Sequence, residues 1–394
     1  MRLILILLSF CVWVSCENKP KLSDQTITVE RNLIIKFNPK FAFYPNDSGT
    51  FIESKDGKEY FYFCNQTTER ELKIFSASGD FVSTVSLKNL MRTIIEPFTI
   101  SVVSEDTIIF NTFYTNEIVA INKQGDVWFY VKIDELLPDS LSNKYEFWSN
   151  AHKWGMKSNL FVLKSWPTYN LIDDKNLDYA ERTLMYYKCL YNSPHFLIIT
   201  DLFSANAKLR MGVDDLYTDI CNEDCLFDEI PCYRLFNGIL IFFSEYSDNL
   251  FIIDIDKMII DKNIQIKSNY TKVGNDAIKI DKNNLKLQMD YQNDERIKKG
   301  RISNLFFDVK ANKYLVLVTH TKYNADFLKH SYIPKYFSII VLDRNFNQLG
   351  EILFDSNKYN PISAIMTDSG IAFEEINQNN NEKYEKTYVS FKID

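Results

Sequence analysis

The chain has 394 residues, of which 46% are hydrophobic and 25% are charged. These proportions are ordinary for a globular protein and exclude wholesale disorder, a collagen-like repeat and a coiled coil. The net charge of −7 argues against a nucleic-acid-binding protein, which usually carries a basic face. Aromatic residues reach 15% and there are only 11 glycines, a composition that favours strands over helices.

The first residues have the three parts of an export signal. Arg2 supplies a positive charge, residues 3–14 form an apolar run, and Ser15-Cys16 ends it before a polar stretch. The 12 apolar residues are too few to cross a bilayer, which takes about 20 residues. We therefore expect residues 1–15 to be a signal peptide.

The cysteine at this junction resembles the lipobox of bacterial lipoproteins, in which the Cys is diacylated and becomes the first mature residue. The resemblance implies lipidation of Cys16, a tether over residues 16–25 and one domain over residues 26–394. Two or three acyl chains on one residue are enough for stable anchoring. A cell-envelope location in the outer membrane follows, on either its periplasmic or its outer side. An uncleaved anchor and a plain secretory signal are the alternatives.

Strand-like runs recur along the rest of the chain in groups of four, each bounded by turn residues. Two groups align visibly, because residues 71–81 parallel residues 117–127. Their glycines, Gly79 and Gly125, are 46 residues apart, a period that suits a four-stranded propeller blade. Each Gly-Asp pair is typical of a hairpin turn, where glycine tolerates a positive φ.

The final group contains only three runs, and the N-terminal run at residues 26–37 supplies the missing fourth strand. Pairing of residues 26–37 with residues 387–393 closes the ring and leaves only short, protected edges. The sequence therefore predicts an all-β fold, a six-bladed β-propeller. The alternatives are a seven-bladed ring that includes residues 284–291, and two stacked all-β domains.

The positions of the loops depend on how the strands of the third and fourth groups are assigned. The third group is predicted to contain strands at residues 145–148, 160–166, 183–190 and 195–201. The fourth is predicted to end with a strand at residues 264–267.

The long connections all fall on one face of this propeller. They are residues 167–182, 202–231, 268–302 and 322–335. Long loops on a rigid scaffold are where binding residues concentrate. The candidate binding residues on this face are Trp166, Tyr169, Asp173, Asp174, Asp214, Asp215, Tyr217, His320, Tyr323 and Tyr332. Aromatic rings beside carboxylates can stack on and hydrogen-bond a sugar, or anchor a protein partner.

Three cysteines cluster in one of these connections, at Cys221, Cys225 and Cys232. In an oxidising envelope we expect two of them to form a disulfide. Unpaired thiols and a zinc site are the alternatives, although the spacing does not match the usual zinc-binding pairs. We expect no metal site here.

The C-terminal third resembles a known family. The run at residues 336–351, the Asn357–Pro361 stretch, Asp368-Ser369-Gly370 and the closing strand around Phe391 are similar to the uncharacterised Bacteroidetes lipoprotein family called domain of unknown function 4221. The lipobox and the Asp56-Gly57-Lys58 turn fit the same family. The resemblance implies a β-propeller in the cell envelope and almost nothing about chemistry.

Motifs for catalysis are absent from the sequence. There is no G-x-S-x-G, H-E-x-x-H, P-loop, G-x-G-x-x-G or EF-hand pattern, and we expect no catalytic residue and no cofactor. The leading interpretation is a non-catalytic binding module, held to the membrane by its lipid anchor, for an envelope protein or glycan partner. The alternative is an envelope carbohydrate hydrolase that draws its carboxylates from several blades.

Overall fold

The computed structural model describes the strand-forming parts of the chain. These are residues 27–36, 48–52, 56–65, 70–88, 90, 98–112, 115–139, 142, 144–148, 160–168, 181–182, 185, 196–200, 202–203, 208–211, 225–226, 232–236, 238–244, 247–274, 278–279, 299–320, 335–376 and 385–393. Within these ranges no helix is both long and apolar enough to cross a bilayer. The helix α3 has four residues, Ile133–Leu136.

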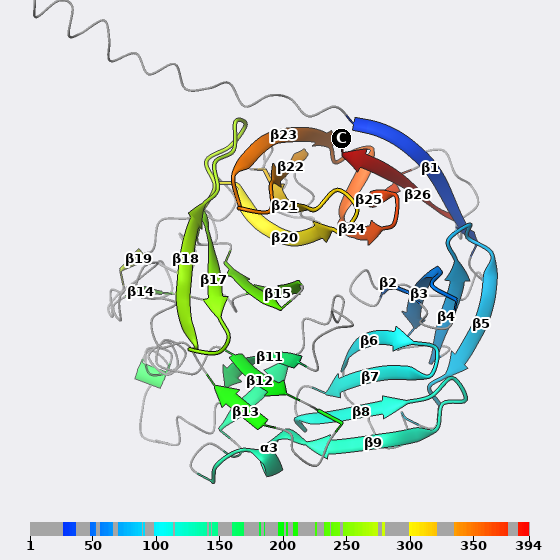
Figure 1. The fold of residues 1–394 in the computed structure, drawn as a ribbon, viewed down its shortest axis with the longest axis vertical. Helices are drawn as coiled ribbons and strands as arrows, with labels where there is room; N and C mark the ends of the chain where they lie inside the picture. The colour runs from blue at the N-terminus through cyan, green and yellow to red at the C-terminus, as the bar shows by residue number, and fades with distance from the viewer. Residues whose placement is uncertain are drawn as a thin grey trace, which may run out of the picture.

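Six antiparallel four-stranded sheets stand around a ring (Figure 1). Blade 1 contains β2 (Ser48–Ile52), β3 (Glu59–Asn65), β4 (Glu71–Ser76) and β5 (Phe81–Ser86), and blade 2 contains β6 (Phe98–Ser104), β7 (Thr107–Thr112), β8 (Glu117–Ile121) and β9 (Val127–Lys132). Blade 3 contains β10 (Tyr145–Trp148), β11 (Leu160–Pro167), β12 (Phe196–Thr200) and β13 (Lys208–Met211), and blade 4 contains β15 (Cys232–Phe236), β16 (Ile239–Phe243), β17 (Asn249–Asp254) and β18 (Ile259–Gln265). Blade 5 contains β20 (Arg301–Asp308), β21 (Lys313–Thr319), β22 (Tyr336–Leu342) and β23 (Gln348–Asp355), and blade 6 contains β24 (Tyr359–Thr367), β25 (Gly370–Glu375), β26 (Glu385–Ile393) and β1 (Ile27–Lys36). The six-bladed prediction is confirmed, whereas residues 284–291, the proposed source of a seventh blade, lie outside the described residues.

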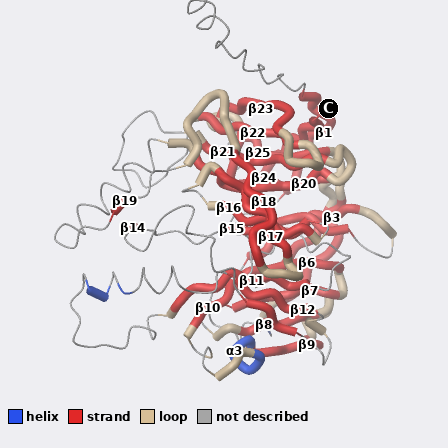
Figure 2. Tube along the Cα trace, turned by 60° about the vertical axis from the view of Figure 1, so that its left-hand side comes forward, coloured by secondary structure: helices blue, strands red, loops and turns tan. Residues whose placement is uncertain are grey.

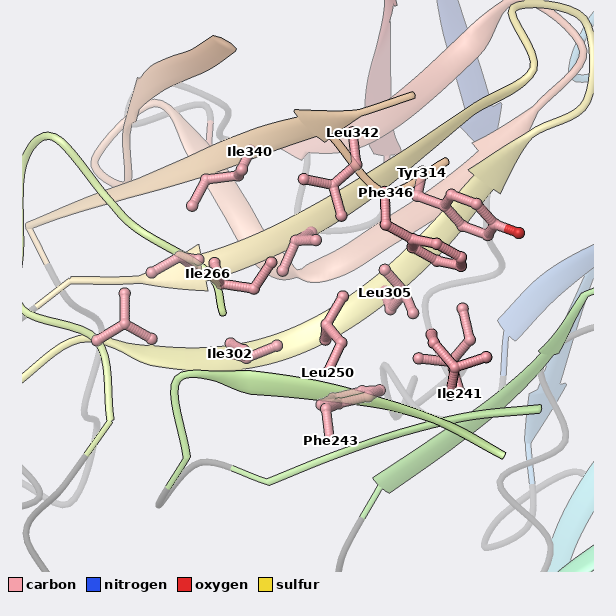
Figure 3. Close-up of a cluster of buried hydrophobic side chains, with 14 residues drawn as sticks. Ile241, Phe243, Leu250, Ile266, Ile302, Leu305, Tyr314, Ile340, Leu342 and Phe346 are labelled. Carbon is pink, nitrogen blue, oxygen red and sulfur yellow. The ribbon is translucent and has the colours of Figure 1, made fainter. Parts of the chain in front are cut away.

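Each blade is buried on both of its faces, which explains why its middle strands are apolar along their whole length. In β16, for example, residues 240–243 are all buried. Successive side chains of a strand point to opposite faces of the blade, so they pack alternately against the two neighbouring blades. Ile241 and Phe243, for example, belong to the apolar cluster that blade 4 shares with blade 5 (Figure 3). The core is therefore a series of layers between blades.

The ring is closed by the two ends of the chain. Strand β1 pairs antiparallel with β26, from Ile27 opposite Ile393 to Lys36 opposite Glu385. In Figure 1 the two strands, drawn in blue and red, lie side by side. The predicted pairing is confirmed, and it leaves blade 6 with its fourth strand.

The turns between the first and second strands, and between the third and fourth, lie on one face, which we call the short-turn face. Asp368 links three of these turns. Its carboxylate forms an ion pair with Lys310 at 3.3 Å. Its main-chain N–H donates a hydrogen bond to Glu59 Oε1 at 2.9 Å. These three residues come from blades 6, 5 and 1. The opposite face, which the longer connections cross, is called the long-loop face.

The assignment of the third blade from sequence was wrong by one strand. Arg182 and Met185, inside or beside the predicted strand at residues 183–190, are helical, and the third strand is β12, at residues 196–200, with β13 outside it. An apolar run of this length cannot be assigned to helix or strand from its pattern alone. The fourth strand of blade 4 was also misplaced, because β18 begins at Ile259 and not at residue 264.

A two-stranded sheet stands apart from the blades in both Figure 1 and Figure 2. It pairs β14 (Cys225–Leu226) with β19 (Ile278–Lys279). The connection from blade 3 to blade 4 thus meets the connection from blade 4 to blade 5. Both had been predicted to cross the long-loop face. The prediction that residues 202–231 form a single connection on that face is wrong, because β13 at Lys208–Met211 interrupts it and residues 202–203 lie in the β12–β13 turn on the short-turn face.

Replacing Gly370 tests the packing of the closing blade. Gly370 has a φ of +116°, and a Cβ there would overlap the carbonyl oxygen of Phe391 in β26. We expect Gly370→Ala to lower the free energy of unfolding by about 3 kcal/mol or more, from both strain and overlap. Gly57→Ala is the matched control, because Gly57 has a φ of +67° with open space around it, and should cost about 1 kcal/mol. Urea unfolding measures both, and equal losses would contradict the role of this contact.

Candidate functional site

The structure describes two of the ten predicted binding residues. Trp166 is the penultimate residue of β11, where that strand reaches the long-loop face. His320 directly follows the end of β21 on the same face. The other eight residues lie outside the described ranges, so their predicted role stays a prediction; they are Tyr169, Asp173, Asp174, Asp214, Asp215, Tyr217, Tyr323 and Tyr332.

The predicted disulfide also stays a prediction. Cys232 is half-buried at the start of β15. Cys225 lies in β14, and Cys221 lies outside the described residues, as does the predicted lipidation site, Cys16.

A buried carboxylate organises the region around His320. Glu351, in β23, is only 2% exposed. Its Oε1 accepts hydrogen bonds from Ser338 Oγ at 2.5 Å and from Ser268 Oγ at 2.7 Å, and its Oε2 accepts one from the Asn269 N–H at 2.6 Å. Both oxygens of this buried carboxyl group therefore have hydrogen-bond donors. Glu351 therefore fastens the connection that leaves blade 4 onto the outer strands of blade 5.

His320 extends this network to the surface. Its Nε2 lies 2.9 Å from Ser338 Oγ. Because the single hydroxyl proton of Ser338 is donated to Glu351, Ser338 can only accept from His320, so Nε2 carries the imidazole proton. The lone pair of Nδ1 is then the acceptor that remains. Burial lowers the pKa of His320 from 6.5 to about 4, and the ring is neutral at pH 7.

Tyr270 completes the site at the surface. Its ring stacks on that of His320, with the centroids 6.0 Å apart and the planes at 27°. Tyr270 is 47% exposed. The turn that presents it is held by Ser268 Oγ, which accepts from the N–H groups of Tyr270 and Thr271 at 3.1 and 3.2 Å. An exposed ring on a rigid support is suited to stacking with a ligand.

The order of the groups in this network does not fit nucleophilic catalysis. In a serine hydrolase the histidine lies between the serine and the acid and takes the serine proton. Here Ser338 lies between His320 and Glu351, donates its proton to the carboxylate and is fully buried. Ser338 is therefore not an activated nucleophile.

The innermost strands also lack the carboxylate pair of a glycoside hydrolase. Glu146 in β10 and Asp308 in β20 are the only acidic residues of β2, β6, β10, β15, β20 and β24. Glu146 lies near the long-loop end of its strand, whereas Asp308 lies at the short-turn end and accepts from the Ala311 N–H at 2.9 Å. Among the residues that the structure describes, no cluster of three or more His, Cys, Asp or Glu side chains could hold a metal ion.

Sequence reasoning found His320 and missed its partners. Ser338 and Glu351 lie in the run at residues 336–351, which the sequence linked only to the family resemblance, and Tyr270 was one residue in a long connection. A glutamate within an otherwise apolar run, as in Glu351-Ile-Leu-Phe, was the available signal, because a buried charge needs donors.

The pKa of His320 makes stability depend on pH. The folded ring stays neutral down to about pH 4, whereas an unfolded histidine protonates near pH 6.5. Between these values the unfolded chain binds more protons, so the free energy of unfolding should fall as the pH drops from about 6.5 to about 4. His320→Gln keeps an N–H donor but has no group that titrates between pH 4 and 6.5. Urea unfolding should therefore show a free energy of unfolding that changes less with pH in this range. Tyr270→Phe, the control, should keep the wild-type slope, and equal slopes for wild type and His320→Gln would contradict the assignment.

Known structures share this architecture. No protein-family model and no curated protein matches the chain. A member of the DUF4221 family from Bacteroides vulgatus superposes with a TM-score of 0.71 and 16% identity, over 95% of this chain and 99% of that one. A Bacteroides fragilis protein whose name assigns it to the exported proteins superposes with a TM-score of 0.51 and 10% identity, over 96% of this chain and 98% of that one. The resemblance drawn from the C-terminal third of the sequence is thus confirmed at the level of the fold, and the chain is a six-bladed β-propeller of the kind found in that DUF4221 family member.

Proposed function

We propose that this protein is a DUF4221-type lipoprotein of the bacterial envelope that binds a protein or glycan partner on its long-loop face and performs no chemistry of its own. Export on the signal at residues 1–15 and lipidation of Cys16 place it in the outer membrane. The observation that carries the binding role is the exposed Tyr270–His320 platform, which the buried Glu351 holds in place.

The position of β1 supports an orientation in which the platform faces away from the bilayer. Ile27 lies opposite Ile393, next to the turn between β24 and β25, so β1 begins at the short-turn face. Cys16 is 27 − 16 = 11 residues earlier, a span of at most about 40 Å when fully extended. A lipid on Cys16 therefore keeps the domain close to the membrane and attaches it at the face opposite His320.

Exposed aromatic residues on the same side support this orientation. Trp128, at the start of β9, and Phe203, just after β12, both lie next to short turns and are 46% and 43% exposed. Their rings are 4.9 Å apart. Tryptophan at a membrane–water interface is favoured because its ring is apolar and its N–H can hydrogen-bond.

Lipidation is tested by replacing the acylated residue. Cys16→Ser should abolish incorporation of an alkyne-labelled fatty acid and release the protein from the membrane fraction, since it removes the thiol that carries the acyl chains. Cys11→Ser is the matched control, because Cys11 lies inside the apolar run, and should be labelled like the wild type. Labelling of Cys16→Ser would contradict the proposed anchor.

Partner binding is tested by cross-linking the tagged, lipidated protein in its own cells and identifying what is recovered with it. Tyr270→Ala should reduce recovery of the partner by about tenfold or more, because an exposed tyrosine on a rigid support is a typical hot spot. Trp128→Ala, on the opposite face, should leave recovery unchanged. If wild type recovers no protein or glycan above background, the binding role fails and the hydrolase alternative becomes the one to assay.

A further inference from the structure

An arginine is buried between blades 4 and 5, where no described side chain gives it an acidic partner. Arg234 is the third residue of β15, the innermost strand of blade 4, and is only 7% exposed. Its Nε and Nη2 donate to Asn304 Oδ1 at 3.2 and 2.6 Å, and its Nη1 donates to the Tyr233 carbonyl at 2.8 Å. The ring of Phe243 lies 5.9 Å from Cζ. The titratable side chains beside it are Cys232 and Tyr233; no carboxylate contacts it within the described part of the chain.

Burying the Arg234 charge destabilises the folded protein unless a negatively charged group neutralises it. A buried guanidinium without a counter-ion carries a desolvation penalty of several kcal/mol. Burial accordingly lowers the pKa of Arg234. The neighbouring Phe243 belongs to the apolar cluster between blades 4 and 5 (Figure 3), and an apolar surrounding strengthens any ion pair that Arg234 forms.

The hydrogen bonds leave a defined pair of donors open. A guanidinium has five N–H groups, one on Nε and two on each terminal nitrogen. Asn304 takes one from Nε and one from Nη2, and Tyr233 takes one from Nη1. One N–H on Nη1 and one on Nη2 therefore have no acceptor among the described residues. Two such donors can bind both oxygens of one oxyanion group at once.

The charge of the site selects among oxyanions. Arg234 is the one cation in its set of contacts, so a group with a single negative charge neutralises it, whereas a phosphate dianion leaves an excess charge. Asn304 Oδ1, which also accepts from the Leu305 N–H at 2.8 Å, holds the guanidinium in place from β20. The strands that carry the two residues, β15 and β20, are the innermost strands of their blades (Figure 1).

The geometry points to a carboxylate-binding subsite at the inner edge of blades 4 and 5, in which the terminal nitrogens of Arg234 bind both oxygens and Asn304 positions the guanidinium. The ligand is a carboxylate carried by an acidic sugar or by an acidic peptide group. This subsite is separate from the Tyr270–His320 platform and does not require the lipid anchor or the partner proposed above.

The test is the thermal unfolding midpoint of the purified full-length protein in four sodium salts at equal ionic strength: glucuronate, N-acetylglutamate, phosphate and chloride. At a ligand concentration a hundredfold above Kd, a carboxylate should raise the Tm by about 3 °C over chloride for a chain of this size. Arg234→Lys keeps the charge but loses the two-donor fork, and should weaken binding of the carboxylate by about tenfold or more. Arg344→Lys, which changes an exposed arginine in the β22–β23 turn, is the matched control and should keep the wild-type shift.

Asn304→Asp provides a second variant that should fold. It gives Arg234 an internal carboxylate, so it should raise the Tm in chloride and remove most of the shift caused by added carboxylate. A shift with glucuronate alone assigns an acidic sugar, and a shift with N-acetylglutamate assigns a peptide group; either supports the subsite. Equal midpoints for wild type in all four salts, a larger shift with phosphate than with either carboxylate, or a full shift in Arg234→Lys would overturn it. The failure of this proposal is independent of partner recovery in cells.

Discussion

The pairing of β1 with β26 is the constraint on which the other features of this protein depend. It joins the two ends of the propeller in one sheet, so the ring cannot form until both ends of the chain are present. Contacts between residues so distant in sequence carry a loop-closure cost, which the burial of apolar layers between blades must offset. The same pairing sets which face the N-terminal segment leaves from. A lipid on Cys16 would thereby determine which face of the domain points away from the membrane.

Packing between blades explains both the composition and the few polar groups in the core. Because every blade is covered on two sides, its middle strands need apolar residues at consecutive positions, and the many phenylalanines fill these layers. Two buried polar side chains that cross between blades, Asn116 and Tyr233, bond to main-chain groups. Asn116 of blade 2 donates to the Tyr145 carbonyl at 2.6 Å and accepts from the Phe147 N–H at 2.9 Å, and the Tyr233 hydroxyl donates to the Val162 carbonyl. Arg234 differs from them because it brings a full charge into the same kind of position.

The functional features gather around blades 4 and 5. Glu351 holds the connection between these blades, His320 and Tyr270 lie where that connection meets blade 5, and Arg234 contacts Asn304 across the two innermost strands. Glu351 and Arg234 are both buried charges, but their surroundings differ. Glu351 is satisfied by three donors within the protein and makes the structure rigid, whereas Arg234 keeps two donors that no group in the described part of the chain accepts. A buried charge that is satisfied within the protein stabilises the fold, and one that keeps open donors is a candidate for ligand binding.

The sequence by itself determined the strand-turn period, the number of blades and the closing strand, because apolar runs bounded by turn residues report local conformation directly. It was least accurate for outer strands: β18 has mostly exposed side chains and β13 is also outermost, so neither needs the apolar pattern that marks a buried strand. The run at residues 183–190 was apolar enough to pass for a strand, and only the sheet pairing showed that β12 occupies that place. The tertiary structure alone decided the sites. Ser268, His320, Ser338 and Glu351 come from four separate segments, and no local spacing records that they meet. Whether a buried charge such as Arg234 has a partner is likewise a property of its neighbours in space, which the order of residues along the chain does not contain.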